Sequence, residues 1–105
     1  AETLGGTWKN KNPGSWGVGC FSFFPTKNIT TGEGGMITCN SRKLYEKFKM
    51  MAAHGISTQS IEREKNNLPW TKIAEIPGHN FRLSNLLAAL GYAQLKRIKL
   101  LNNWE

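Results

Sequence analysis

Long apolar runs, cysteines and acidic residues are all scarce in this sequence, and each shortage excludes a class of protein. The longest mostly apolar run, residues 83–93, is about half as long as a membrane-spanning helix and contains Ser84 and Asn85. The first ten residues lack the apolar segment of a signal peptide, so we expect none. Cys20 and Cys39 have the spacing of neither a metal site nor a disulfide framework. We therefore expect reduced, buried thiols in a cytoplasmic protein without a metal site.

The shortage of acidic residues leaves the chain basic. Lys and Arg number 14 against 7 Asp and Glu, which gives a net charge of +7. Such a charge suits an anionic partner: nucleic acid, an acidic membrane surface or a phosphorylated ligand. Because the lysines are scattered and form no dense tract, a solvated surface or a phosphorylated ligand is favoured.

The 105 residues are enough for one domain at most, and two short apolar runs predict its strands. Residues 18–24 and 35–39 are apolar without helical spacing, which is typical of short buried strands. Residues 25–34, between them, carry Pro, Asn, Thr and Gly and predict a structured turn.

A first helix is predicted after these strands. Ser41 is a suitable N-cap, and Gly55 marks the expected end of the helix. The spacing of Leu44, Phe48 and Met51 places their side chains on one face, opposite the charged residues.

A second helix is predicted from the Ser84 N-cap to about Asn102, and its apolar first half indicates burial on several sides. The polar residues 56–78 predict a long irregular connection between the helices. This order of elements is that of an α/β protein. Two short strands make a poor free-standing sheet, so we expect the chain to be a fragment of a larger domain.

Lys27 is the first candidate for chemistry, because it follows an apolar strand and enters a turn rich in Thr and Gly. An amine against an apolar wall has its charged form disfavoured and can then attack a carbonyl group. Ser22 could reach the same pocket from the strand and bind a phosphate oxygen. On the residues alone, the alternative is a lysine in an exposed hairpin turn.

Residues 21–35, FSFFPTKNITTGEGG, resemble the cofactor-lysine motif of the DegT/StrS family. Members of that family are aminotransferases that use pyridoxal 5'-phosphate (PLP) and act on nucleotide-linked keto-sugars. Residues 1–6, 48–55 and 78–95 resemble further parts of the family, so the resemblance covers the whole chain. It implies an α/β fold: a fragment of the large PLP-binding domain of an aspartate-aminotransferase-like (fold type I) enzyme.

The resemblance implies roles for three residues. Lys27 would hold PLP covalently and then move a proton during the reaction. Ser22 would bind the cofactor phosphate. Asn80 would reach across a homodimer interface to the phosphate of the neighbouring subunit's PLP; the alternative is a turn asparagine before a helix.

Three other residues receive no firm role. Glu2 stands where many members of the family have Gln or His near the cofactor ring. Arg82 would either hold the anionic substrate or form a salt bridge at a surface or interface. His54 closes a helix, and we expect it to be structural.

The resemblance also implies that residues 1–105 are a partial large domain, without its N-terminal part and without the C-terminal domain. The family's Asp that pairs with the PLP ring nitrogen belongs upstream of Ala1. We therefore expect the isolated chain to be inactive. A parallel sheet normally has helices on both faces, so we also expect Leu86, Leu87 and Leu90 to be exposed in it.

The implied reaction is transfer of an amino group, from glutamate, to a nucleotide-linked 4-keto or 3-keto sugar. Dehydration is a second interpretation, but the family's dehydratases carry histidine in place of the lysine, and Lys27 argues against it. A small basic module that binds nucleic acid or an acidic partner is a third. It is disfavoured because Trp8, Trp16 and Trp70 do not interleave with a basic stripe.

Overall fold

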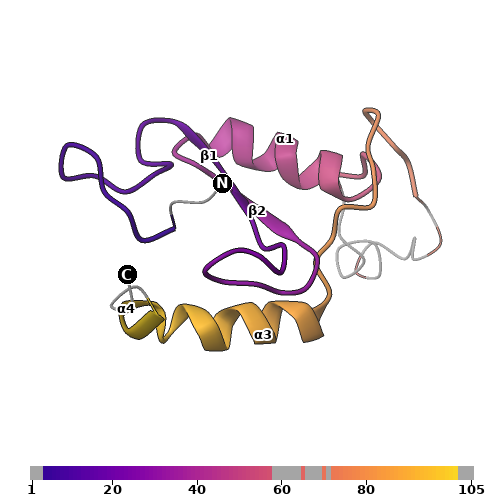
Figure 1. Cartoon of the computed structure of the whole chain (residues 1–105). Coiled ribbons are helices and arrows are strands. Elements are labelled where there is room, and N and C mark those ends of the chain that lie inside the picture. Colours follow the sequence, from indigo (N-terminus) through magenta and orange to yellow (C-terminus); the bar gives the residue numbers. More distant parts are fainter. Residues whose placement is uncertain (1–3, 58–64, 66–69, 71, 102–105) are drawn as a thin grey trace. The chain divides into compact units, whose positions relative to one another are not determined.

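The computed structural model describes residues 4–57, 65, 70 and 72–101 of the chain. The chain forms two compact units: Ala1–Ser41 with Leu83–Glu105 make the first, and Arg42–Arg82 make the second. Figure 1 shows the strands and helices along the chain. Much of the expected connection over residues 56–78 lies outside the described residues, namely 58–64, 66–69 and 71.

The first unit contains a two-stranded sheet. β1 (Val18–Ser22) and β2 (Gly35–Cys39) pair antiparallel, from Val18 opposite Cys39 to Ser22 opposite Gly35. The expectation of a parallel sheet is therefore wrong for these strands, because their connection turns back without the helix that a parallel crossover usually needs. The predicted positions are confirmed, except that β1 ends before the predicted residue 24.

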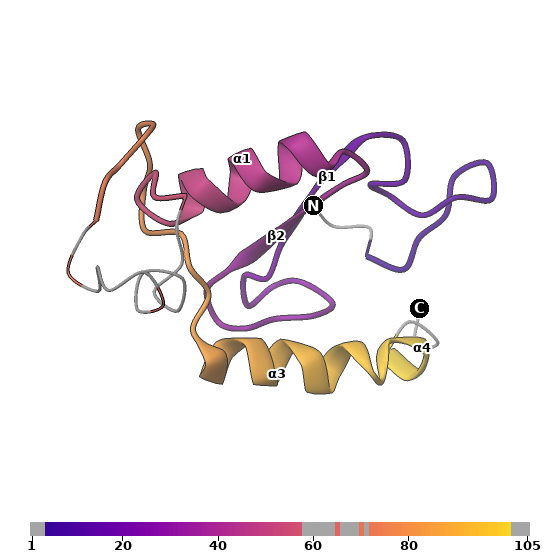
Figure 2. The ribbon, with the colours of Figure 1, turned by 180° about the vertical axis from the view of Figure 1, so that it is seen from behind.

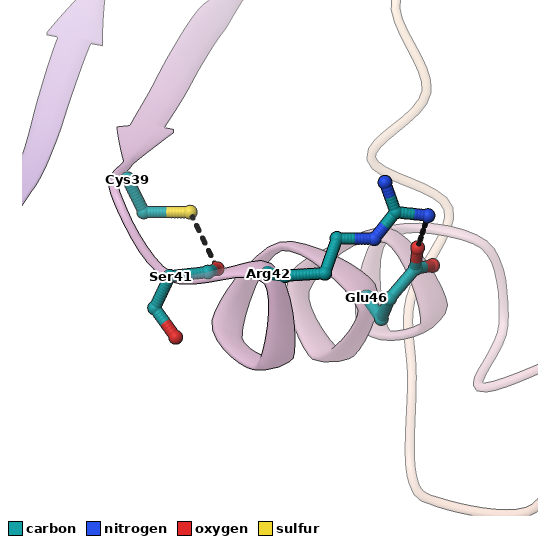
Figure 3. Close-up of polar contacts among 4 residues, drawn as sticks. All are labelled: Cys39, Ser41, Arg42 and Glu46. Carbon is teal, nitrogen blue, oxygen red and sulfur yellow. Dashed lines mark hydrogen bonds and ion pairs between the residues drawn. The ribbon is translucent and has the colours of Figure 1, made fainter.

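The strands are less buried than the sequence predicted. Gly19 alone is buried in β1, and the first three residues of β2 are exposed. Cys20 and Cys39 are free, but Cys20 is exposed and Cys39 is half-buried, so the expectation of buried thiols is wrong. A two-stranded sheet has too few neighbours to cover both of its faces. The Cys39 thiol donates to the Ser41 carbonyl oxygen over 3.6 Å (Figure 3).

The buried side chains of the first unit lie in the loop between the strands. Among the described residues these are Phe23, Ile29 and Thr31, at 8%, 2% and 1% exposure. The loop lies beside helix α3 (Asn85–Leu95) in both views of the ribbon (Figures 1 and 2). Gly91 permits this approach, because a Cβ at that position would come within 2.9 Å of Thr31 Cγ2.

Helix α3 begins as predicted but ends earlier. Its N-cap is Ser84, whose hydroxyl oxygen accepts from the Leu87 N–H over 3.3 Å. The predicted single helix is interrupted, and a short helix α4 (Ile98–Leu101) follows. At the break, the Arg97 N–H bonds to the Gln94 carbonyl three residues back, which tightens the turn. The predicted end at Asn102 lies outside the described residues.

The apolar first half of α3 is not buried on several sides. Leu86 is 84% exposed and Leu90 is 48% exposed, as expected for the chain alone, whereas Leu87 is half-buried. No helix in the described part of the chain is long and apolar enough to cross a membrane.

The second unit begins with helix α1 (Arg42–Ala52), which starts directly after Ser41 as predicted. An exposed ion pair joins Arg42 and Glu46, one turn apart, at 2.5 Å (Figure 3). The helix ends in a left-handed turn at His54 (φ 62°) and Gly55 (φ 76°). There the Gly55 N–H donates to the Met50 carbonyl oxygen over 2.9 Å, so the helix end is capped.

An extended segment is held against this turn within the second unit. The His54 N–H donates to the His79 carbonyl over 2.9 Å, and the Phe81 N–H donates to the Ala52 carbonyl over 3.0 Å. The approach is so close that a Cβ on Gly55 would overlap the Ile76 carbonyl oxygen. Glycine is therefore required at position 55 for two reasons, its positive φ and the absence of a side chain.

We expect Gly55→Ala to lower the free energy of unfolding by about 3 kcal/mol or more, because overlap with backbone adds to left-handed strain. Gly32→Ala is the matched control: Gly32 has φ 79°, but a Cβ at that position would meet nothing within 4 Å. The free energy of unfolding of the control should fall by about 1 kcal/mol, which is the cost of the left-handed strain alone. Urea denaturation of the purified protein measures both changes, and equal losses would contradict the close approach.

Candidate functional site

Lys27 lies in a closed loop of the first unit. The Phe23 N–H donates to the Gly34 carbonyl over 2.9 Å, and the Thr31 N–H donates to the Phe23 carbonyl over 3.0 Å. The Lys27 N–H donates to the Phe24 carbonyl over 3.0 Å, which forms a tight turn at the start of the loop. The backbone at both ends of the loop is therefore fixed by hydrogen bonds inside the unit.

Thr30 joins the two sides of this loop. Its hydroxyl donates to the Phe23 carbonyl over 2.9 Å and accepts from the Gly32 N–H over 2.9 Å. Its backbone N–H donates to Gln94 Oε1 over 3.1 Å, and its carbonyl accepts from Gln94 Nε2 over 2.6 Å. Thr30 is therefore bonded both within the loop and to helix α3.

Gln94 and Thr30 were not predicted from the sequence as part of the site. Gln94 is a polar side chain in a largely apolar helix, and this contrast was the available signal. Its partner could not be found from the sequence, since the two residues are 64 positions apart.

Lys27 and Ser22 line the same small cavity of about 10 Å³ in the first unit, and both are half-buried. The remaining lining residues are Leu4, Phe21, Phe23, Asn28 and Ile29. The Ser22 hydroxyl oxygen accepts from the Phe24 N–H at 3.4 Å, a long contact that leaves the hydroxyl hydrogen able to donate elsewhere. Lys27 and Ser22 thus line one cavity together with aromatic and aliphatic residues.

A larger cavity of about 270 Å³ lies between the hairpin and α3 in the same unit. Its walls include Phe21, Phe23 and Met36 from the hairpin side and Leu83, Tyr92 and Leu95 from the helix side. Among the residues that the structure describes, none of those lining this cavity is charged, so they offer packing surface and no group for acid–base chemistry.

Asn80 lies in the second unit and is exposed. Its backbone forms an extended bridge with Ala53, and Asn80 Oδ1 accepts from Arg82 Nε over 3.0 Å. This bond fixes the orientation of the amide, with Nδ2 as the remaining donor group. Lys27 and Ser22 are brought together in the first unit, whereas Asn80 belongs to the second unit.

The other three candidate residues are placed as follows. Arg82 contacts Asn80, and this contact is a hydrogen bond and no salt bridge. His54 is exposed in the left-handed turn after α1, which accords with a structural role. Glu2 lies outside the described residues.

The comparisons with known proteins agree on one family. The model of the DegT/DnrJ/EryC1/StrS aminotransferase family matches residues 1–104. The chain is 41% identical to GDP-perosamine synthase of Caulobacter vibrioides over 99 residues, which cover 93% of this chain and 24% of that protein.

Two solved structures are also similar. Helicobacter pylori PseC, an aminotransferase involved in the biosynthesis of pseudoaminic acid, shows 32% identity and a TM-score of 0.76, over 95% of this chain and 25% of its own. The E. coli GDP-4-keto-6-deoxy-D-mannose-3-dehydratase with bound hydrated PLP shows 28% identity and a TM-score of 0.77, over 94% and 28% of the two chains.

The fold is therefore a fragment of an aspartate-aminotransferase-like (fold type I) enzyme. The chain belongs to the DegT/DnrJ/EryC1/StrS aminotransferase family. It spans about a quarter of the length of the curated relatives that it matches.

We expect Thr30→Val to lower the free energy of unfolding by about 1–3 kcal/mol, because the Phe23 carbonyl and the Gly32 N–H each lose a partner. Thr26→Val is the control, since Thr26 is exposed in the same loop and none of the described contacts involves its side chain. The control should change stability by less than about 0.5 kcal/mol. Similar losses in both variants, in urea denaturation, would argue against a special role for Thr30.

Proposed function

We propose that this chain is part of a PLP-dependent aminotransferase that transfers an amino group to a nucleotide-linked keto-sugar. The observation that carries the proposal is the placement of Lys27, in a closed loop beside Ser22, within a chain of this aminotransferase family. The names of the relatives support a sugar as the substrate, since one is a GDP-perosamine synthase. Glutamate as the amino donor is part of the proposal.

The residues around Lys27 fit the cofactor. PLP is a phosphorylated aromatic aldehyde, and when bound it supplies a ring that accepts electrons from the substrate. The small cavity offers an amine for the aldehyde, a hydroxyl for the phosphate and the apolar side chains of Phe21 and Phe23. A cavity of about 10 Å³ has room for about one water molecule, so this unit supplies one wall of the proposed site.

In the proposed mechanism, Lys27 Nζ holds the cofactor covalently and later accepts and returns a proton. The Ser22 hydroxyl donates to the phosphate, and Phe21 and Phe23 exclude water from the amine.

The third proposed residue, Asn80, acts across a homodimer. Its Nδ2 group would donate to the cofactor phosphate of the neighbouring subunit, while Arg82 holds the amide in the required orientation. If so, each complete site contains Lys27 from one protomer and Asn80 from the other.

Dehydration is the second candidate, because one similar solved structure is a dehydratase. Lys27 favours amino transfer, since the family's dehydratases carry a histidine in its place. We also propose that residues 1–105 are a part of the large domain, because the chain spans about a quarter of its relatives. The free thiols of Cys20 and Cys39 suit a reducing compartment such as the cytoplasm.

We expect Lys27→Ala, made in the full-length protein that contains this chain, to abolish amino transfer from glutamate to nucleotide-linked keto-sugars. Borohydride reduction followed by peptide mass spectrometry should find PLP attached to the peptide of residue 27 in the wild type and none in the variant. Lys43→Ala, which removes an exposed lysine of α1, is the control and should keep both properties. Retained turnover in Lys27→Ala would overturn the assignment.

Subunit mixing tests the proposed role of Asn80. Lys27→Ala and Asn80→Ala homodimers should each be strongly impaired, and a mixed dimer should regain activity because one of its two sites contains both residues. About a quarter of wild-type activity is expected when the subunits exchange at random, since half of the dimers are mixed and each has one intact site. Absence of rescue, with exchange confirmed by mass spectrometry, would contradict a shared site.

A further inference from the structure

We propose that Gln94 of α3 is a positioning residue for Lys27: its side-chain amide holds the loop that carries the lysine. The proposal rests on the proposed function of Lys27, and it names a residue that does not itself touch the cofactor. The contacts that carry it all lie within the first unit.

The Gln94 amide binds Thr30 as a neighbouring strand would. Its Oε1 accepts from the Thr30 N–H over 3.1 Å, and its Nε2 donates to the Thr30 carbonyl over 2.6 Å. Residues directly opposite each other in an antiparallel sheet exchange the same pair of bonds. One side chain therefore satisfies both backbone groups of a loop residue that lies three positions after Lys27.

The amide is itself held in place. Gln94 Nε2 also donates to the Leu90 carbonyl of its own helix over 3.3 Å, so both amide hydrogens are used. The bonds to Thr30 are partly buried, and a partly buried backbone group that loses its partner is not fully compensated by water. The side chain is thus fixed by the helix on one side and by the loop on the other.

Thr30 connects Gln94 to residues near both ends of the loop. Its hydroxyl bonds to the Phe23 carbonyl and to the Gly32 N–H, on opposite sides of Lys27. The adjacent Thr31 packs against Gly91, one turn before Gln94. Figure 2 shows the loop following the helix along this side. Loss of the Gln94 amide would release the Thr30 backbone from helix α3, while the β1–β2 ladder and the bonds of the Thr30 hydroxyl would remain.

The test uses Gln94→Met in the full-length protein. Methionine keeps the length of the side chain but can neither accept from the Thr30 N–H nor donate to its carbonyl. Arg97→Met introduces the same residue three positions later, where none of the described contacts involves the original side chain. Gln94→Glu keeps the side-chain volume and an acceptor for the Thr30 N–H but loses the donor to the Thr30 carbonyl. The same measurements are made on this variant if Gln94→Met does not fold.

Amide hydrogen exchange, measured without added PLP, tests whether Gln94 protects the backbone of the loop from opening. In Gln94→Met we expect residues 25–34 to exchange at least about tenfold faster, while β1 and β2 keep their protection. Arg97→Met should match the wild type. Unchanged exchange in the loop, or an equal rise in loop and strands, would overturn the proposal, because the second result marks a general loss of stability.

The rate at which PLP becomes attached to Lys27, followed by borohydride trapping and mass spectrometry, measures positioning. We expect it to fall about tenfold or more in Gln94→Met and to stay normal in Arg97→Met. A loosened loop with a normal attachment rate would overturn the positioning role. If the wild type itself attaches no PLP at Lys27, the proposed function fails, and the exchange experiment still shows whether Gln94 holds the loop.

Discussion

The pair of hydrogen bonds between Gln94 and Thr30 is the interaction on which the loop that carries Lys27 depends. The loop between the two short strands, residues 23–34, has many backbone groups that need partners, and a two-stranded sheet supplies few. Helix α3 supplies hydrogen-bond partners to the loop backbone through the Gln94 amide, and the Thr30 hydroxyl supplies a further partner from within the loop. Two of the buried residues in the described part of the unit, Ile29 and Thr31, are the sequence neighbours of Thr30. The position of Lys27 follows from the bonds between Gln94 and Thr30, because they hold the loop that carries the lysine.

The second unit uses a different constraint, the close approach of two backbone segments. A left-handed turn at His54 and Gly55 ends α1 and receives the extended segment that carries Asn80. The absence of a side chain at Gly55 is what makes room for that segment. Arg82 then orients the amide of Asn80. In both units a candidate site residue is therefore placed by backbone geometry and by hydrogen bonds from a second side chain, Gln94 in the first unit and Arg82 in the second.

Much of the fold was predictable because its causes are local. The strands, the start of α1 and the Ser84 cap of α3 follow from apolar runs and capping residues within a few positions. Prediction failed where the neighbours of an element decide its state. The antiparallel pairing, the exposed Cys20 and the break between α3 and α4 depend on what each segment meets in space.

The family and the candidate lysine follow from the amino-acid sequence alone, because residues 21–35 form a continuous motif that can be identified without knowledge of any distant residue. The cavity shared by Lys27 and Ser22 and the bonds between Gln94 and Thr30 became visible only in the folded chain. The physical reason is distance along the chain. A hydrogen bond between residues 64 positions apart leaves no periodicity or spacing in the sequence, and it exists only once helix and loop are packed together.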